Sequence, residues 1–176
     1  MWIPIKTLYL SELKIQQELN QMGEETFVPM RYEAPEMTPR EELVNYPLVP
    51  AVHNLLFVHK EYNKRWCDGL RDKIDYPLSF IKLASGDKDY ATIKDDEMSV
   101  FMRVCSPEHF GTQYKTMDEL KAKAGMMVRV KRGEFEGIIG KFVRFHKRHY
   151  IAIETAGICA LMTIKYSDVE VLKELS

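Results

Sequence analysis

The most constraining feature of this sequence is the alternation of apolar and polar positions over about its last fifty residues. Apolar residues recur at every second position in five short segments: Val128 and Val130, Val143 and Phe145, Ile151 and Ile153, Ala160 and Met162, and Val169 and Val171. A period of two is typical of β-strands, and turns separate the segments at intervals of roughly 6–12 residues. We therefore predict a small, closed or nearly closed β-barrel of five strands, with residues 146–149 as the polar tip of its central hairpin.

The preceding part of the chain switches between helical and strand periods. The pattern predicts strands over 2–9, 25–33, 55–58 and 78–83, helices over 11–22, 62–70 and 95–105, and a Pro-rich, charged loop over 33–50. Ser11 can cap the first helix and Gly23 can end it. Residues 55–58 are apolar at consecutive positions, which indicates a strand buried on both faces. Met98, Phe101, Met102 and Cys105 form one apolar stripe on the last helix. The sum predicts an α+β domain in which helices cover a mixed or antiparallel sheet.

Charge divides the chain at the same place as the change of period. The whole chain holds 25 Lys and Arg against 26 Asp and Glu, but the part from Gly125 onward holds nine against six. Residues 106–115 show neither hydrophobic period, and residues 116–119 read as a capping box. We predict an N-terminal domain over 1–105, a linker over 106–124 and the barrel over 125–176.

Several classes of protein are excluded by what the sequence lacks. Apolar runs are shorter than the roughly 18 residues that a membrane helix needs, and the start shows no secretory signal. Cys67, Cys105 and Cys159 lie far apart, which favours a reducing cytoplasm over a disulfide framework. Phosphate-binding glycine motifs, nucleophile elbows and zinc-ligand spacings are absent. We predict a cytoplasmic monomer that is not an enzyme and that binds no cofactor or metal.

Residues 125–143, GMMVRVKRGEFEGIIGKFV, resemble the KOW motif. The motif positions are Val128, Val130, Gly133, Gly137, Gly140 and Val143. Val128 and Val130 alternate so as to fill a barrel, and Gly133 suits the turn after their strand. Gly137 and Gly140 permit a sharply bent second strand that crosses close to its neighbour. KOW domains occur in ribosomal proteins and in transcription elongation factors, so the motif alone leaves both open.

The N-terminal part resembles the NGN domain of the NusG family. Trp2 on the first strand, a helix, and then FVPMRYE over 27–33 are similar to the opening of that domain. PLVP over 47–50 followed by NLLFV over 54–58 is similar to a later strand of the family. The resemblance implies an α+β NGN-like domain followed by a small SH3-like five-stranded β-barrel. In character the sequence is closest to the specialised paralogues that regulate capsular polysaccharide operons.

This resemblance implies a transcription elongation and antitermination regulator. The NGN domain would bind the clamp helices of the largest RNA polymerase subunit. Carried over by position, the polymerase-binding residues are Trp2, Tyr32, Pro50, Leu55 and Phe57. The KOW barrel would recruit a small-subunit ribosomal protein, Rho or nucleic acid. The chain departs from the family by an insertion at 51–53 and by the missing aromatic residue in the loop 154–158.

Two further interpretations stay open. By composition alone, Trp2, Leu55 and Phe57 are core residues, whereas the polymerase interpretation requires the apolar surface around 50–57 to lie open to water. The basic tip with Arg144, Lys147 and Arg148 is either a solvated turn or a contact to nucleic-acid phosphates. The alternative function is therefore that of a ribosome- or RNA-binding KOW protein.

Overall fold

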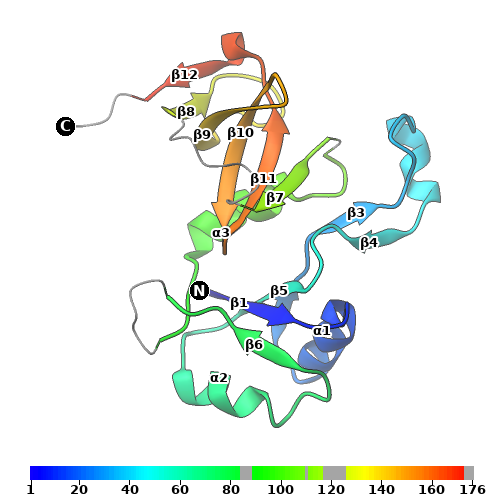
Figure 1. Cartoon of the computed structure of the whole chain (residues 1–176), viewed down its shortest axis with the longest axis vertical. Helices are drawn as coiled ribbons and strands as arrows, with labels where there is room; N and C mark the ends of the chain where they lie inside the picture. The colour runs from blue at the N-terminus through cyan, green and yellow to red at the C-terminus, as the bar shows by residue number, and fades with distance from the viewer. Residues whose placement is uncertain (84–88, 110, 117–125, 173–176) are drawn as a thin grey trace. The chain divides into compact units, whose positions relative to one another are not determined.

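The computed structural model describes residues 1–83, 89–109, 111–116 and 126–172. The chain divides into two compact units, Met1–Met98 and Ser99–Ser176. Each unit is built around its own antiparallel sheet (Figure 1). The predicted fold class is confirmed: helices accompany a sheet in the N-terminal unit, and a β-rich unit follows it.

The sheet of the first unit has the strand order β2-β5-β1-β6. Its strands are β1 (Trp2–Thr7), β2 (Glu25–Phe27), β5 (Leu55–His59) and β6 (Leu78–Phe80). All neighbours pair antiparallel. Helices α1 (Glu12–Gln21) and α2 (Lys64–Leu70) pack on one face of this sheet. The core between the sheet and the helices contains Ile3 and Ile5 of β1, Leu56 and Val58 of β5, Ile15 and Leu19 of α1, and Cys67 and Leu70 of α2. The two central strands thus supply four apolar residues to this core, and Thr7 at the end of β1 is a buried polar residue.

Helix α1 ends as predicted but begins differently. Gly23 adopts φ = +83°, and the N–H of Glu24 donates to the Leu19 carbonyl, which together close the helix. The Ser11 hydroxyl, however, does not cap the helix: it donates to the Leu8 carbonyl at 2.6 Å. The prediction that Ser11 accepts from the first helical amides is therefore wrong: its backbone, at φ −95° and ψ 8°, lies outside the extended region typical of an N-cap.

Residues 25–50 form three strands that belong to two sheets, where one strand over 25–33 and a loop over 33–50 were predicted. After β2, the chain passes Pro29 and enters β3 (Met30–Tyr32), which pairs with β4 (Leu48–Pro50) in a separate two-stranded sheet. The 3₁₀ helix η1 (Arg40–Asn45) lies between β3 and β4. Pro29 has no N–H to donate to a strand ladder, which explains why β2 ends just before it and why β2 is an edge strand.

Helix α3 (Asp95–Val104) occupies the predicted range and begins with three acidic residues that suit its N-terminal dipole. Its stripe differs by one position from the prediction. Met98, Phe101 and Cys105 are buried, but Met102 is only half-buried and Val104 takes its place.

The second unit contains a six-stranded sheet of order β12-β8-β9-β10-β11-β7. Its strands are β7 (Gln113–Thr116), β8 (Met126–Val130), β9 (Ile139–Phe145), β10 (Arg148–Thr155), β11 (Ile158–Thr163) and β12 (Val169–Val171), with the 3₁₀ helix η2 (Tyr166–Asp168) before the last. The five predicted strands are present. Strand β7 adds a sixth: its residues were assigned to the linker, yet they pair with β11. The predicted capping box extends into residues that lie outside the described part of the chain.

The KOW-like positions have the conformations that their residue types suggested. Val128 and Val130 are fully buried, and Val143 is half-buried against the cluster around Tyr150. Gly133 and Gly137 adopt positive φ in the β8–β9 turn. Gly140 is needed for close approach instead, because a Cβ there would lie 2.6 Å from Ile151 Cγ2 and 2.9 Å from the Ala152 carbonyl oxygen.

An ion pair ties the β8–β9 turn to η2 and gives a prediction for acidic pH. Arg132 Nη2 lies 2.7 Å from Asp168 Oδ1, and the hydrogen bonds from Arg132 hold the pKa of the Asp168 carboxyl below its ordinary value. Because folding lowers the pKa of this carboxyl, the ion pair stabilises the folded state at pH values above the unfolded-state pKa of about 3.9. This stabilisation is lost as the pH falls through the folded-state pKa. We expect Arg132→Gln to raise the pKa of Asp168 in an NMR titration of its carboxyl carbon.

The matched control for this titration is Arg129→Gln. Arg129 pairs with Glu170 at 3.1 Å, so its loss should leave the titration of Asp168 in place. An Asp168 titration that is the same in wild type and in Arg132→Gln would contradict the assignment of the shift to Arg132.

Candidate functional site

Three of the five predicted polymerase-binding residues share one face of the first sheet. In the β1–β5 register, Trp2 pairs with His59, Pro4 with Phe57 and Lys6 with Leu55, so these side chains point away from α1 and α2. Phe27 of β2 pairs with Phe57, and their ring centroids lie 6.2 Å apart. The sheet therefore carries a second apolar layer, opposite its helical core.

This second layer is buried, which corrects the expectation that it lies open to water. The exposed fraction is 5% for Trp2, 4% for Leu55 and 0% for Phe57. Trp2 is enclosed from two sides, because its ring stacks on His59 at 4.7 Å and its backbone exchanges two hydrogen bonds with Ile93. Phe57 lies on the central strand β5, where it pairs with Pro4 of β1 on one side and with Phe27 of β2 on the other. The composition-based alternative, that these residues are core, describes them better.

A charged cluster borders this layer. His59 directs Nδ1 at Glu25 Oε2, 2.6 Å away, and Nε2 at Asp95 Oδ1, 3.0 Å away. The Met1 amino group lies 3.1 Å from the same Asp95 oxygen and, with a hydrogen bond, lowers the pKa of that carboxyl. A ring that faces a carboxylate at both nitrogens donates to both only as the imidazolium. The cluster fastens β2, β5 and the start of α3 to one another.

The other two predicted residues, Tyr32 and Pro50, lie on the β3–β4 hairpin and are both half-buried. Met30 pairs with Pro50 and Tyr32 with Leu48, so all four side chains share one face of this hairpin. Leu48 is exposed there. The prediction from the sequence missed Met30 and Leu48, although the alternation within MRY and LVP was a usable signal. The structure thus distributes the five residues over two different sheets.

The sequence-based reasoning also missed the loop between β1 and α1. Leu8, Tyr9 and Leu10 are exposed, Tyr9 by 87%, and the last two adopt positive φ. Asn54 fixes the loop: its side-chain oxygen accepts the Leu10 N–H at 3.1 Å, and its carbonyl accepts the Thr7 N–H at 3.0 Å. Three adjacent apolar residues before a predicted helix cap were the available signal.

The basic tip of the barrel is a tight hairpin turn. Arg148 pairs with Phe145, which leaves His146 and Lys147 as a two-residue loop with φ of +45° and +65°. Positive φ at both positions matches the right-handed twist of the strands, as in a type I′ turn. Arg144, Lys147 and Arg148 are all exposed. The register places Arg144 opposite His149, on the other side of the hairpin from Arg148.

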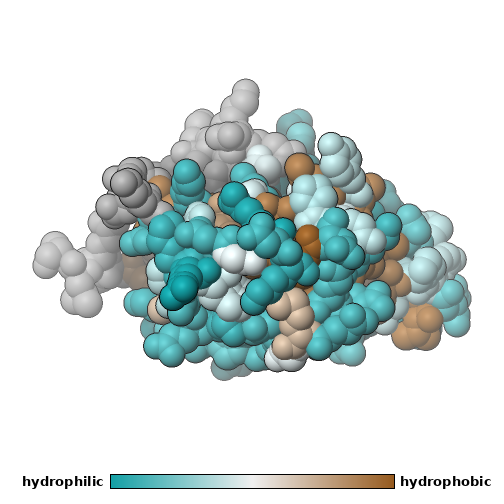
Figure 2. Space-filling view, turned by 90° about the horizontal axis from the view of Figure 1, so that it is seen from below, coloured by the Kyte–Doolittle hydropathy of each residue, from teal (hydrophilic) through white to brown (hydrophobic). Residues whose placement is uncertain are grey.

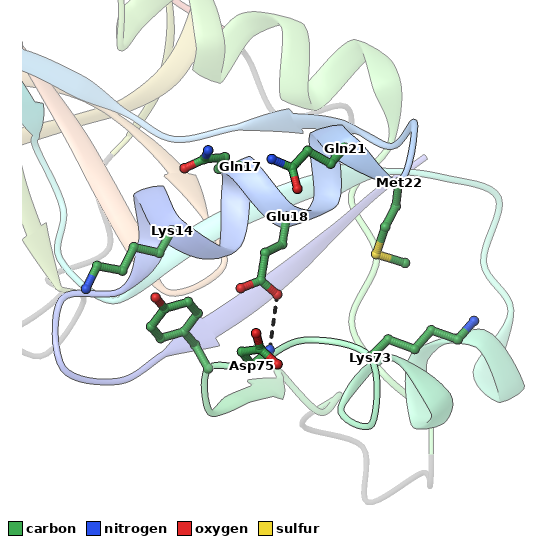
Figure 3. A pocket seen from close by; sticks show the side chains of 8 residues that line it. Lys14, Gln17, Glu18, Gln21, Met22, Lys73 and Asp75 are labelled. Carbon is green, nitrogen blue, oxygen red and sulfur yellow. Dashed lines mark hydrogen bonds between the residues drawn. The ribbon is translucent and has the colours of Figure 1, made fainter.

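A pocket of about 630 Å³ lies between α1 and the segment after α2 (Figure 3). Its lining is mostly polar, and the Glu18 carboxylate points from α1 to accept the N–H of Asp75 at 3.1 Å. Lys14 Nζ lies 5.3 Å from the centre of the Tyr76 ring. These contacts join the helix to the loop and leave no nucleophile and base side by side. The face of the molecule shown in Figure 2 is likewise mainly hydrophilic.

The side chains most suited to nucleophilic or metal chemistry are not arranged for it. Burial raises the pKa of the Cys67 and Cys159 thiols to about 11 and that of Cys105 to about 12, so all three remain protonated at neutral pH. Among the residues that the structure describes, no group of three His, Cys, Asp or Glu is placed to hold a metal ion. None of the described helices is long and apolar enough to cross a bilayer.

The fold itself has a counterpart among solved structures. No protein-family model matches the chain, and no curated protein sequence does. Twelve chains of solved structures match. One of them, reported as "Domain interaction in Thermotoga maritima NusG", has a TM-score of 0.50 and 20% sequence identity, with 98% of this chain and 97% of that chain covered. The chain shares the fold of this NusG.

The likeness extends over both units, and this agrees with an NGN-like sheet domain followed by a KOW-like barrel. At this identity it describes the architecture.

Proposed function

We propose that this chain is a transcription elongation and antitermination factor. Its N-terminal unit binds the clamp helices of the largest RNA polymerase subunit, and its barrel recruits a second partner, for which a small-subunit ribosomal protein, Rho and nucleic acid are the candidates. The factor acts in the cytoplasm, as a monomer and without catalysis. A protein that prefers the closed, elongating polymerase raises the population of that form by its differential affinity.

This proposal rests on one observation: the order of the NGN-like and KOW-like motifs in the sequence matches the order of the two units in the structure. The NGN-like signatures fall in the first unit, the KOW-like motif falls in the second, and the fold of both together is similar to that of NusG over 98% of the chain. The absence of an activated thiol among the three cysteines is compatible with a role in binding.

We propose that the polymerase surface comprises Trp2, Tyr32, Pro50, Leu55 and Phe57. In the state described, direct contact falls on Tyr32 and Pro50, because these two are accessible on the β3–β4 hairpin. Trp2, Leu55 and Phe57 form the buried layer of the first sheet, and a partner reaches them only where this face opens. Leu48 shares the hairpin face with Tyr32 and Pro50 and is exposed, so it completes the contact, whereas Met30 on the same face packs against the core.

The test is retention of core RNA polymerase by the immobilised full-length chain. We expect the wild type to retain polymerase and Tyr32→Ala to bind it about 5- to 30-fold more weakly, since losing one aromatic anchor at an interface removes roughly 1–2 kcal/mol. Aspartate at Leu55 or Phe57 is a poorer test, because a charge at these buried positions would unfold the unit instead.

Tyr76→Ala is the matched control for Tyr32→Ala. Tyr76 is also a half-buried tyrosine, but it lies at the pocket beside α1, on the helical side of the sheet. If the wild type failed to retain polymerase, the proposed function would be wrong. If both tyrosine variants weakened retention equally, the hairpin would not be the contact.

We further propose that the factor serves a dedicated operon, as capsular polysaccharide paralogues do. The resemblance of FVPMRYE and NLLFV to that group motivates this narrower role. Unchanged read-through of a neighbouring polysaccharide operon after deletion of the gene would rule it out.

A further inference from the structure

Three aromatic rings form a continuous cluster on the barrel, beside the basic tip. The ring of Phe142 on β9 stacks on that of His149 on β10, with centroids 5.0 Å apart and planes 21° apart. The ring of Tyr166 in η2 meets Phe142 edge-on at 5.8 Å. Phe142 and His149 are half-buried, whereas Tyr166 is 63% exposed. The Tyr166 ring therefore exposes most of its surface to solvent, and its edge-on contact with Phe142 holds it in place.

Unneutralised positive charge lies next to these rings. Arg144 stands two positions after Phe142 on the same side of β9, and it is the cross-strand partner of His149. Residues 142–149 contain no acidic side chain. Within the described part of the chain, Arg144, Lys147 and Arg148 have no ion-pair partner, whereas Arg129, Arg132 and Lys141 of the same barrel pair with Glu170, Asp168 and Glu154.

We propose that this surface, formed by Phe142, Arg144, Lys147, His149 and Tyr166, binds single-stranded nucleic acid. Exposed bases stack on Tyr166 and on the accessible edge of His149, and the cations of Arg144 and Lys147 contact the phosphates. Aromatic rings interleaved with cations serve both parts of a single strand, its bases and its backbone charge. Bases in a duplex are already stacked on one another, so a duplex can use only the cations.

This inference rests on the proposed recruitment of a second partner by the barrel, and it is separate from the polymerase contact proposed above. The rings and cations all belong to the second unit, and the residues proposed to contact polymerase all belong to the first. Variants of the surface should therefore leave retention of core RNA polymerase unchanged, and either proposal can fail without the other.

The experiment measures binding of the full-length chain to labelled oligonucleotides of about twelve nucleotides by fluorescence anisotropy. The probes are a uridine-rich RNA, a thymidine-rich DNA and a DNA duplex of the same length, each over a range of salt concentrations. We expect Tyr166→Ala to weaken binding of single strands about 5- to 100-fold, because one nucleobase loses the aromatic side chain on which it stacks. Tyr166→Phe retains the ring and should bind like the wild type. Comparing the RNA strand with the DNA strand shows whether the surface prefers single-stranded RNA or single-stranded DNA.

Arg144→Ala and Arg148→Ala form a matched pair of charge variants. Both arginines are exposed on the same hairpin, but only Arg144 shares the side of Phe142 and His149. We expect Arg144→Ala to weaken binding several-fold more than Arg148→Ala, which reduces only the general positive field.

Three outcomes would overturn the proposal. Failure of the wild type to bind any single strand at low salt is the first. Duplex DNA bound as tightly as the single strands is the second, because it would leave only attraction between charges. The third is binding that is unaffected by Tyr166→Ala and equally weakened by the two arginine variants. Tyr166 is largely exposed, so Tyr166→Ala should fold, and an unchanged circular dichroism spectrum checks this.

Discussion

Phe57→Ala is expected to lower the free energy of unfolding of the first unit by about 3–5 kcal/mol. The Phe57 side chain is fully buried on the central strand β5, and its truncation leaves a cavity between Pro4 and Phe27. Both tryptophans of the chain, Trp2 and Trp66, lie in this unit, so denaturant unfolding followed by tryptophan fluorescence reports on it directly.

Tyr9→Ala provides the control for Phe57→Ala. Tyr9 is an aromatic residue of the same unit that is almost fully exposed, and its truncation should change the stability by no more than about 0.5 kcal/mol. A loss below about 1 kcal/mol for Phe57→Ala would mean that its ring is open to water in solution. That outcome would restore the interpretation of Phe57 as an exposed docking residue.

Gly140→Val is expected to disrupt the barrel, with a loss of about 3 kcal/mol or more. A Cβ alone would meet Ile151 Cγ2 at 2.6 Å, Ile153 Cδ1 at 2.7 Å and the Ala152 carbonyl oxygen at 2.9 Å. The carbonyl belongs to the backbone of β10 and cannot rotate aside, so β9 and β10 must separate. Native-state hydrogen exchange of the β9 and β10 amides measures this loss locally.

The contrasting substitution is Gly69→Ala. Gly69 lies in helix α2, and a Cβ there would meet nothing within 4 Å. Alanine should therefore raise stability by about 0.5–1 kcal/mol, through a smaller loss of backbone entropy on folding. Slow exchange of the β9 and β10 amides in Gly140→Val, at wild-type levels, would show that the strands do not cross as closely as described.

The elements that could be predicted are those whose signal is local. The alternation around Val128, the stripe on α3 and Gly23 at the end of α1 each depend on neighbouring residues, and each matches an element of the structure. Strand β7 could not be found this way. Its residues QYKT have no apolar alternation, and they become a strand only by pairing with β11, more than forty positions later in the chain.

The site was harder to predict because two lines of reasoning disagreed over the same residues. The consecutive apolar positions 55–58 indicated a strand buried on both faces, and Leu55 and Phe57 are indeed buried. The family resemblance, in contrast, required them to be open. Which residues share a hairpin face, such as Tyr32 with Leu48, depends on the register between strands that lie far apart in the sequence.

The short outer strands of the first sheet have a consequence for behaviour at high concentration. Strands β2 and β6 each span three residues, and Pro29 follows closely after the first of them. A second copy of the chain would find few unpaired backbone groups there to extend the sheet. Because β1 and β5 lie between these two short strands, this sheet should resist the edge-to-edge pairing that leads to fibrils at high concentration.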